Sequence, residues 1–256
     1  MIFLKELKIL KTHGIQYIND LSAVNLKGPF RGRPELSENA ANDDVVELER
    51  FCPVRAIASQ PIFSLDMGKC VFCRECQFRK PDIIRFTDDY KIASNSREGL
   101  VIRAGDKNTP LIDSAKIRKE IVKIFGKALK LRQVSAGGDN SCEMELNACG
   151  NVNFDMGRFG IEFHASPRHC DGIVVTGPVS QNMSEALKLT YEAVPSPKIV
   201  ILAGVDAISG GLFADSPAID RSYIDRLHVD LYVPGNPIHP LSFINGISHL
   251  LNIRLN

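Results

Sequence analysis

The sequence predicts two successive folded units, a small α+β unit that contains most of the cysteines and a larger α/β domain with a parallel sheet. Four of the seven cysteines fall within residues 52–76, among apolar segments too short for a large hydrophobic core. After residue 128, short apolar runs that end in glycine alternate with stretches of helical pattern, which is typical of a parallel sheet covered by helices. The length of 256 residues suffices for one or two such units.

Residues 1–45 are expected to form an amphipathic helix followed by an extended arm. Residues 1–11 place apolar side chains at positions 2, 3, 4, 7, 9 and 10 and lysines at 5, 8 and 11. This basic helix could lie on a membrane, pack on a partner or dock on its own domain. It is too short and interrupted for a signal peptide or a membrane span, and no later run reaches about 18 apolar residues. Residues 20–45 are polar and broken by prolines, so we expect an arm outside the core.

The cysteines follow an iron–sulfur pattern. In two-cluster ferredoxins, the run C-x2-C-x2-C-x3-C-P gives three cysteines to one cluster and the last cysteine to the other cluster. Here the triad Cys70, Cys73 and Cys76 is present, but the fourth position of its motif is Lys80. The upstream motif keeps only Cys52, before a proline.

What remains is one complete ligand set. Asn42, Val45 and Leu48 stand where the upstream triad would be. Since Cys52 is the crossover ligand for the downstream triad, the four thiols Cys52, Cys70, Cys73 and Cys76 are predicted to bind one 4Fe-4S cluster.

Two other interpretations of these cysteines are weaker. The three closely spaced thiols could hold zinc or stay free, but zinc sites usually pair two Cys or Cys/His knuckles, and His13 is the only histidine in the first 160 residues. A disulfide framework does not suit a long chain with seven cysteines, an odd number, and no mark of secretion.

The α/β domain is expected over residues 112–256. Apolar periodicity predicts a helix over 115–126, ended by Gly126, and another over 180–193. The strands expected are 129–134, 172–177, 198–204 and 229–235. Functional loops of parallel sheets lie beyond the carboxyl ends of the strands, which here are 135–142, 177–183, 204–211 and 235–240.

These loops carry motifs in a recognisable order. The motifs are Gly138-Asp-Asn-Ser-Cys142-Glu143, Arg158-Phe-Gly, Ser166-Pro-Arg168, Val175-Thr-Gly-Pro, Ala207-Ile-Ser-Gly-Gly211 and Pro234-Gly-Asn236-Pro. With them, residues 128–252 resemble the small subunit of membrane-bound [NiFe] hydrogenases and the homologous 20 kDa subunit of NADH:quinone oxidoreductase (complex I). The first half, with Lys27-Gly-Pro-Phe-Arg-Gly-Arg-Pro before the cysteine set, resembles the ferredoxin-like subunit of formate hydrogenlyase and related complexes. The chain is therefore expected to be a fusion of two neighbouring subunits.

The resemblance also implies a site for a second, proximal 4Fe-4S cluster, held in the family by four cysteines. Residue-by-residue carry-over of the motifs places Asp139 and Cys142 in the first loop, Asp206 in the second and Asn236 in the third. Only one of these side chains is a thiol, and oxygen donors suit a hard ion better than a thiolate-bound cluster. We expect the proximal cluster to be absent, with vestigial polar loops in its place or, less simply, a different metal.

The fold class expected is thus an α+β ferredoxin-like 4Fe-4S domain over 46–105, followed by an α/β domain with a parallel, flavodoxin-like sheet. The resemblance implies a non-catalytic iron–sulfur subunit that transfers electrons in a hydrogenase-like or complex I-like oxidoreductase. Its partners would be a large subunit and membrane-arm subunits, which would hold it in the cytoplasm on the inner face of the cell membrane. With 31 basic and 30 acidic residues, the charge gives no reason to expect nucleic acid. The alternative is a structural or regulatory scaffold subunit of such a complex.

Overall fold

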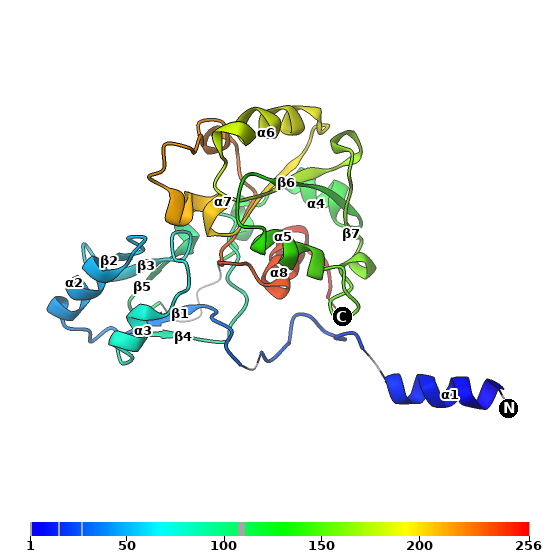
Figure 1. Ribbon diagram of the computed structural model, residues 1–256, viewed down its shortest axis with the longest axis horizontal. Helices are drawn as coiled ribbons and strands as arrows, with labels where there is room; N and C mark the ends of the chain where they lie inside the picture. Colours follow the sequence, from blue (N-terminus) through cyan, green and yellow to red (C-terminus); the bar gives the residue numbers. More distant parts are fainter. Residues whose placement is uncertain (1, 15, 27, 107–110, 256) are drawn as a thin grey trace.

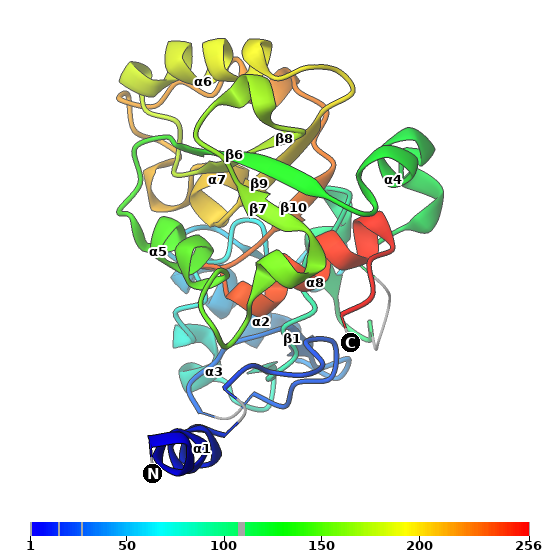
Figure 2. The ribbon, with the colours of Figure 1, turned by 90° about the vertical axis from the view of Figure 1, so that its right-hand side faces the viewer.

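In the computed structural model, which describes residues 2–14, 16–26, 28–106 and 111–255, an α/β domain and a smaller N-terminal unit lie side by side. The N-terminal unit is at the lower left of Figure 1, and the α/β domain fills the centre and the top. A single helix, α1, stands apart from both (Figures 1 and 2).

The α/β domain is built on the predicted parallel sheet. In chain order, its five strands are β6 (Leu129–Ser135), β7 (Ile161–Phe163), β8 (Gly172–Thr176), β9 (Ile199–Ala203) and β10 (Leu231–Val233). Across the sheet they are ordered β10-β9-β8-β6-β7, and every pair is parallel. This sequence of strands has the doubly wound character of flavodoxin-like folds. The chain runs from β6 to β7 on one side of it, and the next connection crosses from β7 to β8 on the other side of β6. The connections change direction here, so a crevice is expected at the carboxyl ends of β6 and β8.

Helices cover both faces of this sheet, as Figure 2 shows. One face packs on α4 (Lys119–Phe125), α5 (Ser141–Ala148) and α8 (Pro240–Leu251), and the other on α6 (Gln181–Ala193) and α7 (Val205–Ser209). Strand residues alternate between the two cores: Val174 faces the α8 side, whereas Ile173 and Val175 face the α6 side. This alternation explains why the strands read as continuous apolar runs.

Short 3-10 helices and further elements absent from the sequence-based prediction complete the domain. The 3-10 helices are Ser114–Lys116, Met156–Phe159, Pro167–His169, Gly211–Phe213 and Ile224–Arg226. The predicted helix over 115–126 is split into the first of these and α4, because residues 117 and 118 are extended. The edge strand β7, the helix α8 and the short helix α7, which lies in the loop expected at 204–211, are additions to the predicted elements.

The N-terminal unit consists of short elements. Its strands are β1 (Pro34–Leu36), β2 (Ile57–Ala58), β3 (Ser64–Asp66), β4 (Ile84–Phe86) and β5 (Val101–Arg103). β1 pairs with β4, and β2, β3 and β5 form a second antiparallel sheet. The helices are α2 (Asn42–Phe51), α3 (Glu75–Arg79) and a 3-10 turn at Glu98–Leu100. An isolated bridge between Ser94 and Tyr232 joins the end of this unit to the edge strand β10.

Residues 20–45, expected to form an extended arm outside the core, are partly structured and partly buried. They contain β1 and the start of α2, and Leu36 is buried. Leu21 is fully buried, and its carbonyl oxygen accepts hydrogen bonds from Tyr90 Oη at 2.9 Å and Asn245 Nδ2 at 2.8 Å. The arm therefore straps the α/β domain before it enters the N-terminal unit, while the domain limits at 46 and 112 stay a prediction.

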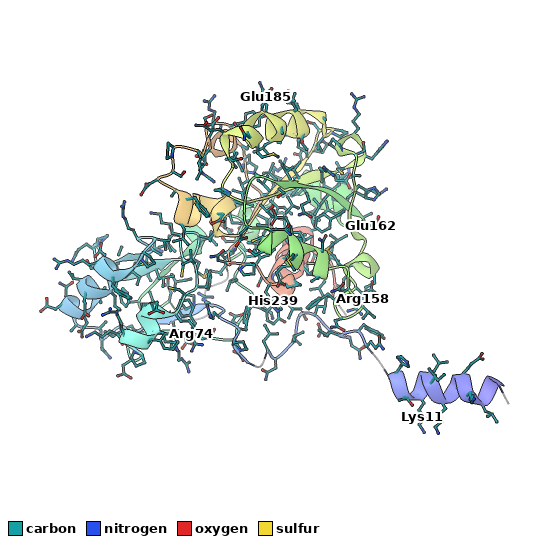
Figure 3. All side chains as sticks on the ribbon, in the orientation of Figure 1. Lys11, Arg74, Arg158, Glu162, Glu185 and His239 are labelled. Atoms are coloured by element: carbon teal, nitrogen blue, oxygen red, sulfur yellow. The ribbon has the colours of Figure 1, made fainter. Side chains whose placement is uncertain are left out.

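The predicted amphipathic helix forms as α1 (Ile2–His13), but it does not dock on its own domain. All of its side chains from Leu4 to His13 are exposed, Leu4 at 70% and Leu10 at 68%. The helix projects away from the body, with Lys11 labelled on it in Figure 3. Of the three possibilities named from the sequence, the first two, a membrane surface and a partner, remain.

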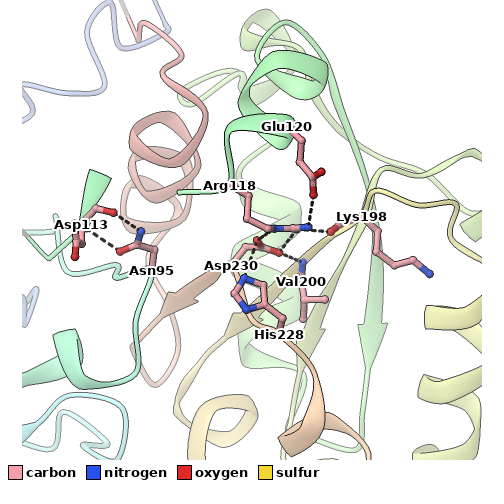
Figure 4. A network of polar contacts seen from close by, with 8 residues as sticks. All are labelled: Asn95, Asp113, Arg118, Glu120, Lys198, Val200, His228 and Asp230. Carbon is pink, nitrogen blue, oxygen red and sulfur yellow. Dashed lines mark hydrogen bonds and ion pairs between the residues drawn. The ribbon is translucent and has the colours of Figure 1, made fainter. Parts of the chain in front are cut away.

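A buried ion pair ties the start of α4 to the β9 and β10 end of the sheet (Figure 4). Arg118 donates from Nε and Nη2 to the two carboxylate oxygens of Asp230 at 2.8 and 2.9 Å, and Nη2 also donates to the carbonyl of Lys198 at 2.6 Å. Asp230, 5% exposed, additionally accepts from the backbone N–H of Val200 at 3.0 Å. This network lies at the amino ends of the strands, away from the loops that carry the motifs.

Candidate iron–sulfur site

The structure brings the four predicted cysteine ligands together around one pocket. Cys52 follows the last residue of α2, Cys76 lies in α3, and Cys70 and Cys73 lie in the loop before α3. All four line the same pocket, which is walled mainly by apolar side chains. These walls are Phe51, Pro53, Val54, Ala56, Ile57, Leu65, Val71 and Phe86, with Arg74 and Glu75 beside the thiols.

Polar contacts brace the loop that carries Cys70. The carboxylate of Asp66 accepts two hydrogen bonds from the Arg97 guanidinium, at 2.8 and 2.6 Å, and one from the backbone N–H of Gly68 at 2.9 Å. The carbonyl of Asp66 accepts from the N–H of Cys70 at 3.0 Å. On the far side of the loop, Arg31 of the arm donates to the carbonyl of Phe72 at 2.6 Å. Segments distant in sequence thus fix the first thiol of the triad.

The backbone of the cysteine loop aims N–H groups at sulfur. Phe72 and Arg74 have left-handed conformations, with φ of 52° and 68°, which are uncommon for residues other than glycine. The backbone nitrogen of Phe72 lies 3.3 Å from Cys70 Sγ and donates to it. Outside this loop, the backbone nitrogen of Ala56 likewise donates to Cys52 Sγ at 3.3 Å. Such donors stabilise thiolates that ligate metal, because they offset negative charge on sulfur.

Without a cation the thiols of Cys70 and Cys76 would stay protonated. Burial raises the pKa of Cys70 strongly, and it raises the pKa of Cys76 to about 11, with the neighbouring thiols adding to both effects through charge repulsion. A metal centre among the sulfurs offsets both the burial of negative charge and the repulsion between thiolates, since its positive charge displaces the protons and neutralises the sulfurs. The donor set therefore fits a thiolate-bound cluster.

The space of the erased upstream motif is filled by apolar side chains. Val45 and Leu48, at two of its cysteine positions on α2, are 2% and 0% exposed. Lys80, at the missing fourth position of the downstream motif, forms ion pairs with Asp44 at 2.6 Å and Glu47 at 3.4 Å. The missing cysteine positions of the two motifs are thus occupied by a hydrophobic contact on α2 and by a salt bridge between the end of α3 and α2.

Within the described residues, no group of three or more His, Cys, Asp or Glu side chains is gathered as a site for a metal ion. The four predicted cysteine ligands share the lining of one pocket without being gathered as such a group. Among the helices of the same ranges, none has the length and hydropathy needed to cross a membrane.

The four vestigial proximal-cluster positions lie near the carboxyl ends of the parallel strands. Asp139 follows β6, Cys142 is buried in the first turn of α5, and Asp206 lies in the first turn of α7 after β9. Asn236, half-buried, follows Gly235, whose carbonyl accepts from the N–H of Val205 at 3.0 Å. Charge interactions with Asp139 and Asp206 reach the Cys142 thiol, so the structure brings these three side chains together.

The electrostatics of these positions differ. Burial, followed by repulsion from Asp139 and Glu143, raises the pKa of Asp206 to about 6. The pKa of Asp139 is lowered because the Ser141 hydroxyl and N–H donate to its Oδ1 at 2.6 and 2.9 Å. Burial raises the pKa of the Cys142 thiol to about 12. Carboxylates that repel one another beside a buried thiol form an acidic site, chemically unlike the cysteine pocket of the N-terminal unit.

Glu143 is a site residue that the sequence-based prediction left without a role. It is 5% exposed, and its Oε1 accepts hydrogen bonds of 2.6 Å from Ser135 Oγ at the end of β6 and Thr176 Oγ1 at the end of β8. It thus closes the crevice between these two strands. Its place directly after Cys142, in the loop that follows β6, is the signal that could have indicated it.

Other motif residues have contacts within the chain. Arg158 donates from Nη2 to the carbonyl of Ile18 and its guanidinium lies over the rings of Tyr17 and Phe159, although its side chain is exposed. Arg168 of the Ser-Pro-Arg motif is exposed. Cys149 and Cys170, outside all predicted ligand sets, are 0% and 3% exposed and pack in the two cores.

The fold and the motifs define the class of protein: a doubly wound α/β domain whose motif-bearing loops lie at the carboxyl ends of a parallel sheet. The model of the NADH ubiquinone oxidoreductase 20 kDa subunit family matches residues 140–250. A probable membrane-bound hydrogenase subunit, mbhJ, of Pyrococcus furiosus is 36% identical over 128 residues, which are 50% of this chain and 77% of that one. The chain therefore belongs to the NADH ubiquinone oxidoreductase 20 kDa subunit family.

Two further relatives were found. An NADH-quinone oxidoreductase subunit of Geotalea daltonii is 42% identical over 109 residues, 43% of this chain and 64% of that protein. Among solved structures, one of an archaeal membrane-bound sulfane sulfur reductase covers 52% of this chain and 73% of the matched chain, with 27% identity and a TM-score of 0.45. The residues matched by the family model all lie in the α/β domain.

Proposed function

We propose that the protein is an electron-transfer subunit of a membrane-associated, hydrogenase-like or complex I-like oxidoreductase, with one 4Fe-4S cluster bound by Cys52, Cys70, Cys73 and Cys76. The observation that carries the proposal is the placement of these four thiols around one apolar pocket with N–H donors to two of the sulfurs. When bound, such a cluster accepts and releases single electrons.

The surroundings favour a cluster over a single zinc ion. All four thiols line one pocket, and the triad Cys70, Cys73 and Cys76 with the distant Cys52 has the spacing of iron–sulfur ligands, whereas zinc sites usually pair two knuckles. Hydrogen bonds to the ligand sulfurs and an apolar wall are features that set the reduction potential of iron–sulfur clusters. On this basis we propose that the N-terminal unit is ferredoxin-like and that the chain is a fusion of a formate hydrogenlyase-type ferredoxin-like subunit with the family's α/β subunit.

In the α/β domain we propose that the proximal cluster is absent. Asp139, Asp206 and Asn236 supply oxygen donors and Cys142 a lone thiol, which is a poor ligand set for a cluster. The domain would then dock on a large subunit, and membrane-arm subunits would hold the assembly at the cytoplasmic face of the membrane. The acidic vestigial site favours a second candidate function, that of a structural or regulatory scaffold without a continuous electron path through this domain.

Electron flow through the purified assembly separates the two candidates. Replacing Cys73 by serine removes a cluster ligand at a half-buried position, with little change in side-chain size. We expect the variant assembly to form and to remain in the membrane fraction, with electron flow between its redox partners reduced at least about tenfold. Wild-type electron flow in a variant that has lost its iron would establish the scaffold function instead.

The exposed helix α1 supports a peripheral location. Its apolar side chains Leu4, Leu7 and Leu10 are 70%, 46% and 68% exposed, and lysines at 5, 8 and 11 alternate with them along the helix. An amphipathic helix of this kind binds an anionic lipid surface through buried apolar area and charge attraction. We propose that α1 adds a lipid contact to the attachment through partner subunits.

Sedimentation with vesicles tests this contact. In the double variant Leu7→Ser and Leu10→Ser, we expect several-fold weaker binding of the full chain to vesicles that contain anionic phospholipid, because two apolar side chains no longer enter the lipid. Leu189→Ser, which changes a similarly exposed leucine (57%) on α6, should bind as the wild type does. Equal binding by the double variant and the wild type would assign α1 to a protein partner.

A further inference from the structure

Arg74 leaves a buried hydrogen-bond donor without a partner at the cluster pocket. It lies between Cys73 and Cys76 in sequence and lines the same pocket as the four thiols. Its Nε is buried and has no hydrogen-bond partner among the described residues. Ser242 and Asn245 also have a buried side-chain oxygen without a hydrogen-bond partner, but neither residue lines the pocket.

A buried N–H of a charged group that has no acceptor destabilises the fold, so we expect an acceptor to lie beside Arg74 Nε when the site is occupied. Burying such a donor without a partner is unfavourable, and the more so when the group is charged. The Arg74 guanidinium contacts the Phe78 ring, 5.4 Å from its centroid, but a ring face on α3 does not satisfy Nε. The candidate acceptors that the pocket would contain are sulfurs, either the cysteine thiolates or the inorganic sulfides of the cluster.

Arg74 is also held where a donor to sulfur is needed. Its backbone has a left-handed conformation (φ 68°) and forms the N-cap of α3, the helix that carries Cys76. The side chain is labelled at α3 in Figure 3. By contrast Arg79, at the other end of the same short helix, stacks on Phe51 with its guanidinium 3.6 Å from the ring centroid and pairs with Glu47. Of these two arginines, Arg74 lines the pocket and Arg79 does not.

We propose that Nε–H of Arg74 donates a hydrogen bond to a sulfur of the 4Fe-4S cluster and thereby raises the reduction potential of the cluster. The inference rests on the proposed function, because it requires the cluster. The physical reason is that reduction adds negative charge to the sulfurs, and a charged donor stabilises the reduced state more than the oxidised one. Arg74 would therefore set the potential without being a ligand.

Redox titration followed by electron paramagnetic resonance tests this role in three variants of the full chain. Arg74→Gln removes the charge and Nε, Arg74→Lys keeps the charge but has no Nε, and Arg79→Gln removes a charge from the same helix outside the pocket. We expect both Arg74 variants to titrate at a lower potential than the wild type, and Arg79→Gln to titrate close to the wild type. A wild-type potential in Arg74→Lys would overturn the hydrogen bond.

A measurement on the unmodified sequence keeps the test independent of variant folding. When arginine is labelled with ¹⁵N only in its guanidinium group, the reduced cluster should show a weak nitrogen hyperfine coupling. Absence of any such coupling would overturn the proposal even if the variants lost their iron. Failure of the proposed function looks different, because wild-type protein would then bind no cluster and give no signal to titrate.

Discussion

Replacing Cys70 by alanine is expected to remove most of the iron from the protein, from about four atoms per chain to below about one. Cys70 is the most buried of the four thiols, 7% exposed, and its sulfur accepts the N–H of Phe72. No other thiol of the described residues lines the pocket, so the remaining three cysteines cannot complete the set. Iron and sulfide analysis after anaerobic purification measures the effect.

Cys142→Ala is the matched control for this prediction. Cys142 is also buried, at 8%, and its thiol pKa is likewise raised by burial, but it lies in the α/β domain at the vestigial site. We expect this variant to keep the full iron content and the same paramagnetic signal as the wild type. Loss of iron in Cys142→Ala with retention in Cys70→Ala would place the cluster in the α/β domain, against the present assignment.

Replacing Arg118 by alanine is expected to lower the free energy of unfolding by about 3–5 kcal/mol, the usual effect of breaking a buried ion pair on one side. The Asp230 side chain, 3% exposed, would lose both guanidinium hydrogen bonds, and its buried carboxylate would keep only the N–H of Val200 at 3.0 Å and the ring of His228 at 3.6 Å. The carbonyl of Lys198 would lose its donor as well. Urea unfolding of the full chain, followed by circular dichroism, measures the change in the transition of the α/β domain.

An exposed pair supplies the control for Arg118. Arg85 donates from Nε and Nη2 to Glu35 at 3.2 and 2.6 Å, but both side chains are more than half exposed, at 66% and 57%. Solvent screens such a pair, so Arg85→Ala should cost less than about 1 kcal/mol. Similar losses in the two variants would show that the Arg118 network contributes no more than a surface contact.

The parts of the fold that could be predicted are those whose pattern is local. β8 and β9 are buried on both faces, and such strands read as unbroken apolar runs that end in glycine. β7 was missed because a three-residue edge strand is too short to show alternation. α8 was missed because it is buried at every residue except His249, so its sequence is a largely apolar run that cannot be told from a buried strand without the fold.

The same division holds for the site. The spacing of Cys70, Cys73 and Cys76 indicates their chemistry directly, since ligands of one loop repeat at fixed intervals. The hydrogen bonds that hold this loop cannot be predicted from local sequence, because Arg31 and Phe72 are 41 positions apart and Arg97 and Asp66 are 31 apart. The hydrogen bond of Glu143 to Thr176 likewise spans 33 positions. Only the folded chain brings such partners together.

The central claim, one cluster bound by the N-terminal unit and none in the α/β domain, is tested most directly by counting iron and sulfide in the full-length wild-type protein purified without oxygen. We expect about four irons and four sulfides per chain, with a single paramagnetic signal in the reduced state. About eight irons with two interacting signals would contradict this claim, because the vestigial loops at Asp139, Cys142, Asp206 and Asn236 would then hold a second cluster.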